Sequence, residues 1–466
     1  MNENKREYLY DYLRLIATIF VVIGHSVYLK MSTTYGGVAY IIPDDVSSIY
    51  YSPFAEVIKF MASWVYGFHM PLFFIMSGAV LALKPIPAFD KFFKSKFKRL
   101  LIPYFVYGIL YMLPVKYLSG FYDVTGFKKA MTGFLSGQDS GHLWFLPALF
   151  WCMLAFMLIN TVISRFTKSN YALLIASGAV LFLYNYIPFD ILQMKRGLAY
   201  IFYFTLGYVL ENERRENKPW CIRKTLSTII ILSVLEVIHN KYHILNTFFV
   251  SLIGSLLTIL IAYLCTKLFA KFSESKAFNV ITRNLFFVYI FHDPLNYIIL
   301  KLFIPSNLIS SDFGCIMYFV CRTLGVFIVS ILLGEMISAT KKLLTASIFT
   351  DSSSHKPSMR HIVTTIVGLI CLIAATTALG FIMNNKTHAA DLTDNNWTNG
   401  IKNNDPTCIL FSNTDINYKK INDAEKLICN GEEFIIEDFH YDNKWIRINV
   451  DKDATACAYP NDLIFK

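Results

Sequence analysis

Apolar stretches of about 20 residues, separated by short polar segments, follow one another up to about residue 383. A helix needs roughly this length to cross about 30 Å of hydrocarbon in a bilayer. The pattern therefore predicts a polytopic all-α membrane protein with a ten-helix core and an eleventh helix. The spans are expected near residues 8–30, 54–82, 100–118, 142–164, 170–187, 191–210, 225–239, 246–266, 284–304, 313–338 and 362–383.

Lys and Arg are distributed unequally between the segments that join these spans. With the N-terminus inside, the inner segments carry 23 Lys and Arg and the outer loops carry 5. Cytoplasmic loops of membrane proteins carry this excess of positive charge. The sequence therefore predicts a bacterial cytoplasmic-membrane protein that crosses the bilayer many times, with a cytoplasmic N-terminus and an extracytoplasmic C-terminus.

The chain changes character after about residue 384. Residues 386–466 have a net charge of −5. Since the whole chain has a net charge of +10, the membrane part has a net charge of +15. Short β-favouring runs such as EEFIIEDFH and KWIRINV alternate there with Asn, Asp and Gly turns. We expect a ten-span domain at 1–345, an inner linker and eleventh helix at 346–383, an outer linker at 384–406 and a small extracytoplasmic all-β domain at 407–466.

The runs DNKWIRINV and AYPNDLIF in this last domain resemble a bacterial SH3-type barrel, and an unclassified β-rich envelope domain explains them equally well. The domain also holds three cysteines, Cys408, Cys429 and Cys457. One pair could form a disulfide outside the cell, and the sequence leaves the choice of pair open.

Composition narrows the possible functions. Of the 466 residues, 55% are hydrophobic and only 16% are charged, well below the charged share of about a quarter in soluble proteins. A cytosolic enzyme and a disordered protein are therefore excluded. The basic residues lie between apolar stretches and not on a soluble face, so the expected partner is the lipid bilayer and no nucleic acid is expected.

Ionisable residues at membrane depth are costly and therefore indicate function. In the first span, Arg14 and His25 are eleven residues apart, which is within about 20° of three full helical turns and roughly 16 Å along the axis. Asp11 lies near the same line. One helix face is thus predicted to run from an Asp–Arg pair at the inner interface to a histidine deep in the bilayer. The alternative is that Arg14 reaches the inner headgroups and His25 forms a packing hydrogen bond.

Three further histidines, His69, His142 and His292, lie in GFHMPLFF, GHLWFLP and VYIFHDPL, each close to a proline. A proline frees backbone groups that can line a cavity. Each histidine alone is readily explained by a packing hydrogen bond. Together the three predict a polar interior shared by several helices.

The inner segment FDKFFKSKFKRLL is rich in basic residues, with Lys98 and Arg99 directly before the third span. Membrane orientation and lipid headgroups explain most of this charge. An anionic, phosphate-bearing ligand would explain it as well, with Arg99 as the best-placed donor. The sequence contains no Gly-rich phosphate loop, HExxH or GxSxG motif, so no metal and no bound cofactor are expected.

Five motifs in order, YLRLIATIFVVIGHS, FHMPLFFIMSG, KRLLIPY, HLWFL and YIFHDPL, resemble the acyltransferase-3 family of bacterial integral-membrane acyltransferases. The similarity covers roughly residues 8–340. It implies a membrane-bound O-acyltransferase that moves an acyl group, usually acetyl, from cytoplasmic acyl-coenzyme A as co-substrate to a hydroxyl of an envelope carbohydrate or lipid-linked glycan.

The resemblance also assigns residues. It implies that His25 and Arg14 are catalytic, that Arg99 and the adjacent Lys98 contact the phosphates of coenzyme A, and that Trp144 and Phe145 form walls of the acyl site. Asp11, His69, His142 and His292 are expected to line the acceptor or the pocket. The small C-terminal domain has no recognisable nucleophile motif, unlike the hydrolase-like outer domain of some relatives, so the membrane domain is expected to complete the transfer alone.

Two other functions remain open. A ten-span bundle with buried His and Arg could be a proton-coupled transporter or a glycan exporter, for which dependence on coenzyme A is the discriminating observation. A membrane sensor that binds a ligand through the outer β domain has less support, because it does not need the aligned Arg14 and His25.

Overall fold

The structure is a computed structural model. It describes residues 7–27, 30–33, 36–39, 53–123, 125–167, 169–216, 222–242, 246–302 and 312–349, together with five strands between residues 416 and 458. The chain divides into two compact units, Met1–Phe381 and Ile382–Lys466. The predicted eleventh span at 362–383 and the predicted linker at 384–406 lie outside the described residues.

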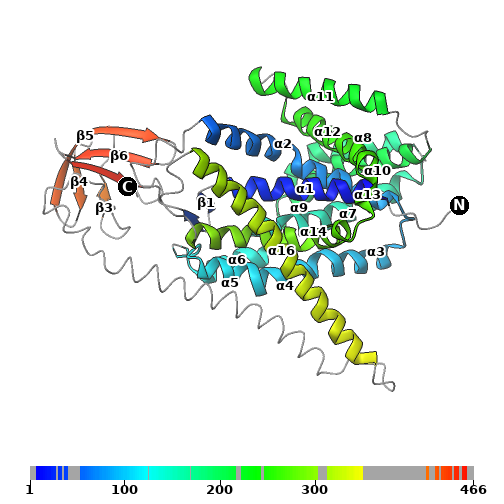
Figure 1. The fold of residues 1–466 in the computed structure, drawn as a ribbon, viewed down its shortest axis with the longest axis horizontal. Coiled ribbons are helices and arrows are strands. Elements are labelled where there is room, and N and C mark those ends of the chain that lie inside the picture. Colours follow the sequence, from blue (N-terminus) through cyan, green and yellow to red (C-terminus); the bar gives the residue numbers. More distant parts are fainter. Residues whose placement is uncertain are drawn as a thin grey trace. The chain divides into compact units, whose positions relative to one another are not determined.

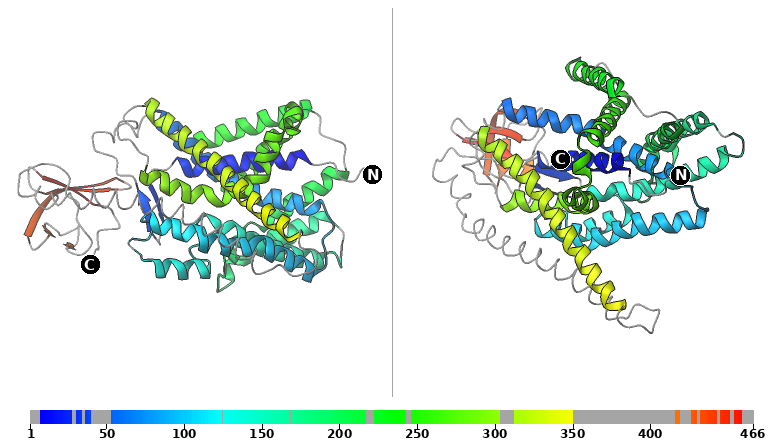
Figure 2. Two further views of the ribbon diagram at one scale, coloured as in Figure 1. Left: turned by 60° about the horizontal axis from the view of Figure 1, so that its bottom comes forward. Right: turned by 45° about the vertical axis from the view of Figure 1, so that its right-hand side comes forward.

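The first unit is a helical bundle with α1 (Tyr8–Ser26) near its middle (Figures 1 and 2). Helix α1 contacts α2 (Pro53–Ala82), α12 (Thr247–Leu268), α14 (Lys276–Leu302) and α16 (Asp312–Phe349). The remaining helices are α3 (Phe89–Lys96), α4 (Ile102–Tyr107), α5 (Leu113–Leu118), α6 (Phe127–Ser136), α7 (Phe145–Ile163), α8 (Asn170–Leu183), α9 (Met194–Ala199), α10 (Ile201–Glu216), α11 (Ile222–Tyr242) and α13 (Ala270–Ser273).

Among the described helices, six segments are long and apolar enough to cross a membrane: Tyr8–Ser26, Phe60–Ala82, Phe89–Leu118, Phe127–Ile163, Thr247–Leu268 and Ile316–Thr340. The prediction of a mostly helical, polytopic membrane protein is confirmed at this level. The other predicted spans within the described residues also contain helices. They are not both long and apolar enough to be counted among the six: α8 and α10 have only 14 and 16 residues, and α14 carries many polar side chains. The number of crossings stays a prediction.

The helix of the third predicted span is interrupted by two π-helical turns. The π-helical turns η2 (Phe97–Leu101) and η3 (Gly108–Met112) stand directly before α4 and α5, whose second residues are Pro103 and Pro114. Proline has no backbone N–H and collides with the carbonyl four residues before it, which disturbs the regular ladder. The chain nevertheless continues as helix to Leu118 and carries Lys116 into the protein interior.

Helices α2 and α10 approach each other closely because both have glycine at the crossing. A Cβ atom on Gly78 would overlap the carbonyl oxygen of Phe204, and one on Gly207 would overlap that of Ile75. Small residues at such crossings allow membrane helices to make extensive van der Waals contact. This contact fixes α2, which carries His69.

Gly207→Ala is expected to destabilise the bundle by about 1–3 kcal/mol, the usual cost of an overpacked interior. Thermal unfolding of the detergent-solubilised protein, followed by size-exclusion chromatography, measures the effect. Gly178→Ala is the matched control, since a Cβ there would meet its nearest neighbour, Phe202, at an ordinary 3.8 Å. Equal unfolding midpoints for the two variants would contradict the close crossing.

The second unit contains one antiparallel sheet in which each strand pairs with the next along the chain. Its strands are β3 (Ile416–Tyr418), β4 (Lys426–Cys429), β5 (Glu432–Asp442), β6 (Trp445–Val450) and β7 (Ala454–Ala458). The register shifts between Ile436 and Asp438 in the pairing of β5 with β6. The SH3-like character of this region and its extracytoplasmic location stay predictions.

Candidate active site

His25 lies in the last turn of α1, because the helix ends at Ser26 and not near residue 30. Directly afterwards, Lys30–Thr33 (β1) pairs with Gly36–Ala39 (β2) as an antiparallel hairpin, so the chain leaves the helical path. The sequence predicted a first span that continues to about residue 30, with His25 deep in the bilayer. The structure places it at the C-terminal end of α1, with 26% of its side chain exposed.

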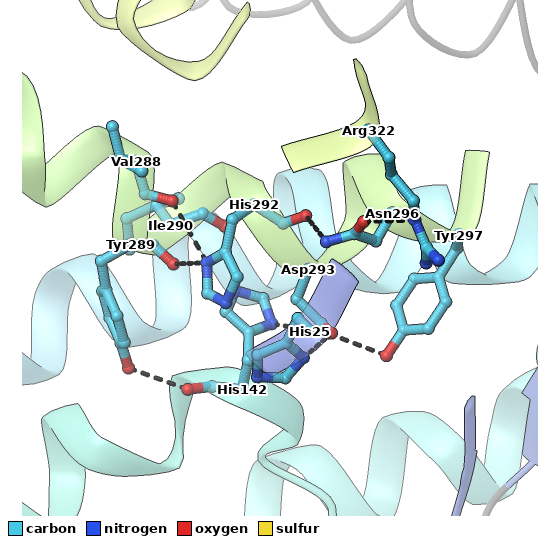
Figure 3. Close-up of polar contacts among 10 residues, drawn as sticks. All are labelled: His25, His142, Val288, Tyr289, Ile290, His292, Asp293, Asn296, Tyr297 and Arg322. Atoms are coloured by element: carbon cyan, nitrogen blue, oxygen red, sulfur yellow. Dashed lines mark hydrogen bonds and ion pairs between the residues drawn. The ribbon is translucent and has the colours of Figure 1, made fainter. Parts of the chain in front are cut away.

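Asp293 of α14 is the centre of the polar cluster (Figure 3). Its Oδ1 lies 2.9 Å from Nδ1 of His25, and its Oδ2 lies 3.1 Å from Nδ1 of His142. The Tyr297 hydroxyl donates a 2.8 Å hydrogen bond to Oδ2. Since Nδ1 of His25 donates to the carboxylate, Nε2 of the neutral ring keeps its lone pair and is available as a base.

Pro294 explains how His142 is held. Proline has no N–H to offer the carbonyl four residues earlier, which is that of Ile290. Nε2 of His142 lies 2.9 Å from this carbonyl oxygen and satisfies it (Figure 3). Both ring nitrogens of His142 therefore face acceptors, Ile290 O and Asp293 Oδ2. Of these two contacts, only the one made by Nε2 has hydrogen-bond geometry.

His292 lies between the other two histidines. Its Nδ1 is 2.8 Å from the carbonyl oxygen of Tyr289 and 3.2 Å from that of Val288. The ring centroid is 4.8 Å from that of His25 and 5.2 Å from that of His142 (Figure 3). Its buried Nε2 has no hydrogen-bond partner among the described residues. The predicted catalytic His25 and two of the predicted pocket histidines, His142 and His292, thus lie together beside Asp293.

A second proline acts in the same way in α2. Pro71 leaves the carbonyl of Gly67 without its helical donor, and the Ser251 hydroxyl of α12 donates to it at 2.7 Å. His69 lies between Gly67 and Pro71 in the chain, and its Nδ1 is 3.0 Å from the carbonyl oxygen of Val65. His69 therefore has a local packing bond and also lines the cavity described below.

A buried arginine of α16 joins the two helices that carry the cluster. Nε of Arg322 donates to the Asn296 side chain at 2.8 Å, and Nη1 donates to the carbonyl oxygen of Ser26 at 3.1 Å. Asn296 in turn donates to the backbone of His292 (Figure 3). The last carbonyls of a helix have no internal partner, so Arg322 caps α1 next to His25.

The cluster opens into a cavity of about 1420 Å³. Helix α1 lines it with Arg14, Thr18, Val21 and His25, one face of the helix, as the Arg14–His25 spacing predicts. One end is lined by Arg14 and by Thr282 and Arg283 of α14, which lie in a predicted inner segment. The other end is lined by Lys116 and Asp139, which lie at a predicted outer boundary.

The other residues singled out in the sequence divide into two groups. Trp144 and Phe145 line the same cavity. Asp11 is not among the cavity residues and instead forms a 2.6 Å ion pair with Arg14, which is one of them. Lys98 and Arg99 are exposed on η2 and are not among the cavity residues, so their role stays a prediction. Within the described ranges, no group of three or more His, Cys, Asp and Glu side chains could hold a metal ion.

Sequence reasoning missed Asp293, Arg322, Lys116 and Asp139. Asp293 directly follows His292 in YIFHDPL, and Arg322 lies inside the predicted span 313–338. The rule that ionisable residues in a span indicate function would have found both, had it been applied to all charged residues and not mainly to histidine. Asp139 lies in a predicted loop and gives no such signal.

Comparison with known proteins assigns the chain to a family. The model of the acyltransferase-3 family, described as an acyltransferase domain, matches residues 7–335. The chain is also similar to nodulation protein NolL of Sinorhizobium fredii (strain NBRC 101917 / NGR234), with 26% identity over 221 residues. That alignment covers 47% of this chain and 53% of the relative, so the chain spans about half the length of the curated relative. No solved structure matches. Because the family model covers most of the chain, the protein belongs to the acyltransferase-3 family.

Proposed function

We propose that the protein transfers an acetyl group from cytoplasmic acetyl-coenzyme A to a hydroxyl of an envelope carbohydrate or glycolipid, in the bacterial cytoplasmic membrane. The observation that carries this proposal is His25, which lines the cavity while its Nδ1 is held by the buried Asp293. Family membership supports acyl transfer. The acetyl group, the coenzyme and the glycan are inferred from what the family motifs imply.

His25 acts as the general base in this proposal. Its Nε2 takes the proton of the acceptor hydroxyl as the oxygen attacks the thioester carbonyl carbon. The tetrahedral intermediate then collapses, the C–S bond breaks, and the coenzyme A thiolate receives the proton from His25. An ester and a free thiol result. Asp293 stabilises the imidazolium that forms between these steps, because its carboxylate lies 2.9 Å from Nδ1.

The cavity has room for both substrates. Pockets for one small molecule usually measure about 300–1,000 Å³, and this cavity exceeds that range. Coenzyme A would enter at the Arg14 end, attracted by the basic inner segments that include Lys98 and Arg99, and its pantetheine arm would run along α1. Trp144 and Phe145 would then enclose the acyl group.

The proposed function is tested with purified protein in nanodiscs and acetyl-coenzyme A labelled in the acetyl group. We expect release of free coenzyme A, and transfer of label to glycolipids extracted from the native membrane. A transporter or exporter would release no thiol. Absence of thiol release from correctly folded protein, with and without glycolipid, would contradict the proposal.

Arg322→Met is expected to lower kcat by about 10- to 100-fold, the usual effect of losing a partner that orients a reacting group. Arg322 touches the Ser26 backbone and Asn296, so it acts on His25 by positioning. The KM for acetyl-coenzyme A should therefore change little. Arg165→Met, at an exposed site, is the matched control, and Arg322→Lys should restore part of kcat. A loss confined to KM would contradict the positioning role.

A further inference from the structure

The cavity end opposite Arg14 holds two buried charges of opposite sign. Lys116 is 1% exposed and Asp139 is 4% exposed, and both line the cavity. Neither side chain forms an ion pair in the described part of the chain, and Oδ2 of Asp139 has no hydrogen-bond partner there. Asp139 accepts a hydrogen bond from the Gly141 backbone, and the opposite charge of Lys116 stabilises it at longer range. Because Oδ2 and the ammonium form no direct ion pair, both keep hydrogen-bonding capacity that a ligand in the cavity can use.

The ammonium of Lys116 is held by aromatic rings. Nζ lies 4.3 Å from the ring centroid of Phe121 and 5.2 Å from that of Tyr297. Contact with an aromatic face stabilises a cation but accepts no N–H hydrogen bond in the ordinary sense. The donors of Lys116 therefore remain available to an oxygen atom in the cavity.

The loop that carries Asp139 is built to hold this geometry. Gly137 and Gly141 have φ values of +86° and +49°, which residues other than glycine rarely adopt. A Cβ on Gly141 would lie 2.9 Å from Nζ of Lys116. The Ser140 hydroxyl, 2.9 Å from the Gly137 carbonyl oxygen, and the Gln193 amide both donate to that oxygen. These polar groups serve the loop, while Lys116 and Asp139 face the cavity.

The charge balance selects the kind of ligand. A phosphate or carboxylate would gain from Lys116 but would be repelled by Asp139. A neutral polyol satisfies both, because each hydroxyl group donates and accepts. One hydroxyl can donate to Oδ2 of Asp139 while its neighbour accepts from Lys116.

We propose that Lys116 and Asp139 form the acceptor subsite and bind two hydroxyl groups of a neutral sugar ring. The reaction performed on that sugar rests on the proposed function, whereas the binding of the sugar does not. Tyr297 connects the subsite to the reaction centre, since its ring contacts Lys116 and its hydroxyl donates to Asp293. A third hydroxyl of the bound sugar would then lie toward His25.

The test measures binding to the full chain in nanodiscs. The probes are octyl β-glycosides of glucose, galactose, mannose and N-acetylglucosamine, deoxy analogues of each, and octyl β-glucuronide as the anion. We expect wild-type protein to bind at least one neutral glycoside. Lys116→Met or Asp139→Asn should weaken that binding by about 10- to 100-fold, as for a lost hydrogen bond to a charged group. Gly141→Ala should also weaken it, by displacing Lys116.

The deoxy probes separate ligand contact from a general structural role. In wild-type protein, removal of the hydroxyl that contacts Lys116 should weaken binding, and in Lys116→Met the same removal should cost nothing further. Lys128→Met, at an exposed site, is the matched control and should change affinity by less than about twofold. Unchanged affinity in both cavity variants, no binding of any neutral glycoside, or preference for the glucuronide would overturn the subsite.

Coenzyme A binding to the same samples distinguishes the two proposals. If coenzyme A does not bind and the sugar does, the proposed function fails and the subsite stands. If coenzyme A binds to Lys116→Met as to wild-type protein, the variant is folded and a loss of sugar binding is specific to the subsite.

Discussion

His25→Gln is expected to reduce acetyl transfer by about 10²–10⁴-fold, the contribution of a well-placed general base. Glutamine keeps the polarity of the site but cannot take a proton from the acceptor hydroxyl at neutral pH. The contact of His25 with Asp293 is made by Nδ1, and the glutamine amide can donate to the carboxylate in its place, so the variant should keep the fold. Labelled acetyl transfer to extracted glycolipid, in nanodiscs, measures the loss.

His239→Gln on α11 is the matched control, since His239 does not line the cavity. It should leave the transfer rate close to that of wild-type protein. Coenzyme A should still bind to His25→Gln, because its proposed docking end is about 16 Å away along α1. A His25→Gln variant with normal transfer would remove His25 from the chemistry.

Asp293→Asn is expected to lower kcat by about 10²–10⁴-fold, although the residue does not contact substrate in the proposed mechanism. The carboxylate faces His25, His142 and Tyr297, and it accepts from His25 and Tyr297. An asparagine amide presents only one acceptor and adds N–H groups of its own. The His25 ring would then turn or change tautomer, and Nε2 would lose its lone pair toward the cavity.

The double variant His25→Gln/Asp293→Asn tests whether the two residues act as a unit. If Asp293 works through His25, the double variant should be no slower than His25→Gln alone. Losses that multiply would show that Asp293 acts independently, through His142 or through the fold. Thermal unfolding of each variant in detergent separates the last two cases.

Much of the helical bundle can be predicted from the sequence, because apolar length and helical periodicity are local properties of the chain. The alignment of Arg14 with His25 follows from their spacing alone, and α1 lines the cavity with both. The end of α1 could not be predicted in the same way. Apolar residues continue past Ser26, and the helix ends there because the chain forms the β1–β2 hairpin and because Arg322, almost 300 residues later, caps it.

The convergence of His25, His142 and His292 on Asp293 is a property of the tertiary structure. Sequence identified the three histidines separately but gave no measure of their proximity. The link between His142 and α14 has a local cause that is visible only with both helices in place: Pro294 leaves the Ile290 carbonyl unpaired, and His142 satisfies it. Lys116 and Asp139 were missed because each is unremarkable in its own segment, and only their shared burial in one cavity indicates a ligand.

In the proposed mechanism, His25 drives acetyl transfer from coenzyme A to an envelope glycan. The most direct test of this step is mass spectrometry of envelope glycans from cells that lack the protein and are complemented with wild-type protein or with His25→Gln. We predict acetylated glycans with the wild-type protein and none with His25→Gln at equal membrane abundance. Identical acetylation in the two complemented strains, or no difference between cells with and without the protein, would contradict the account.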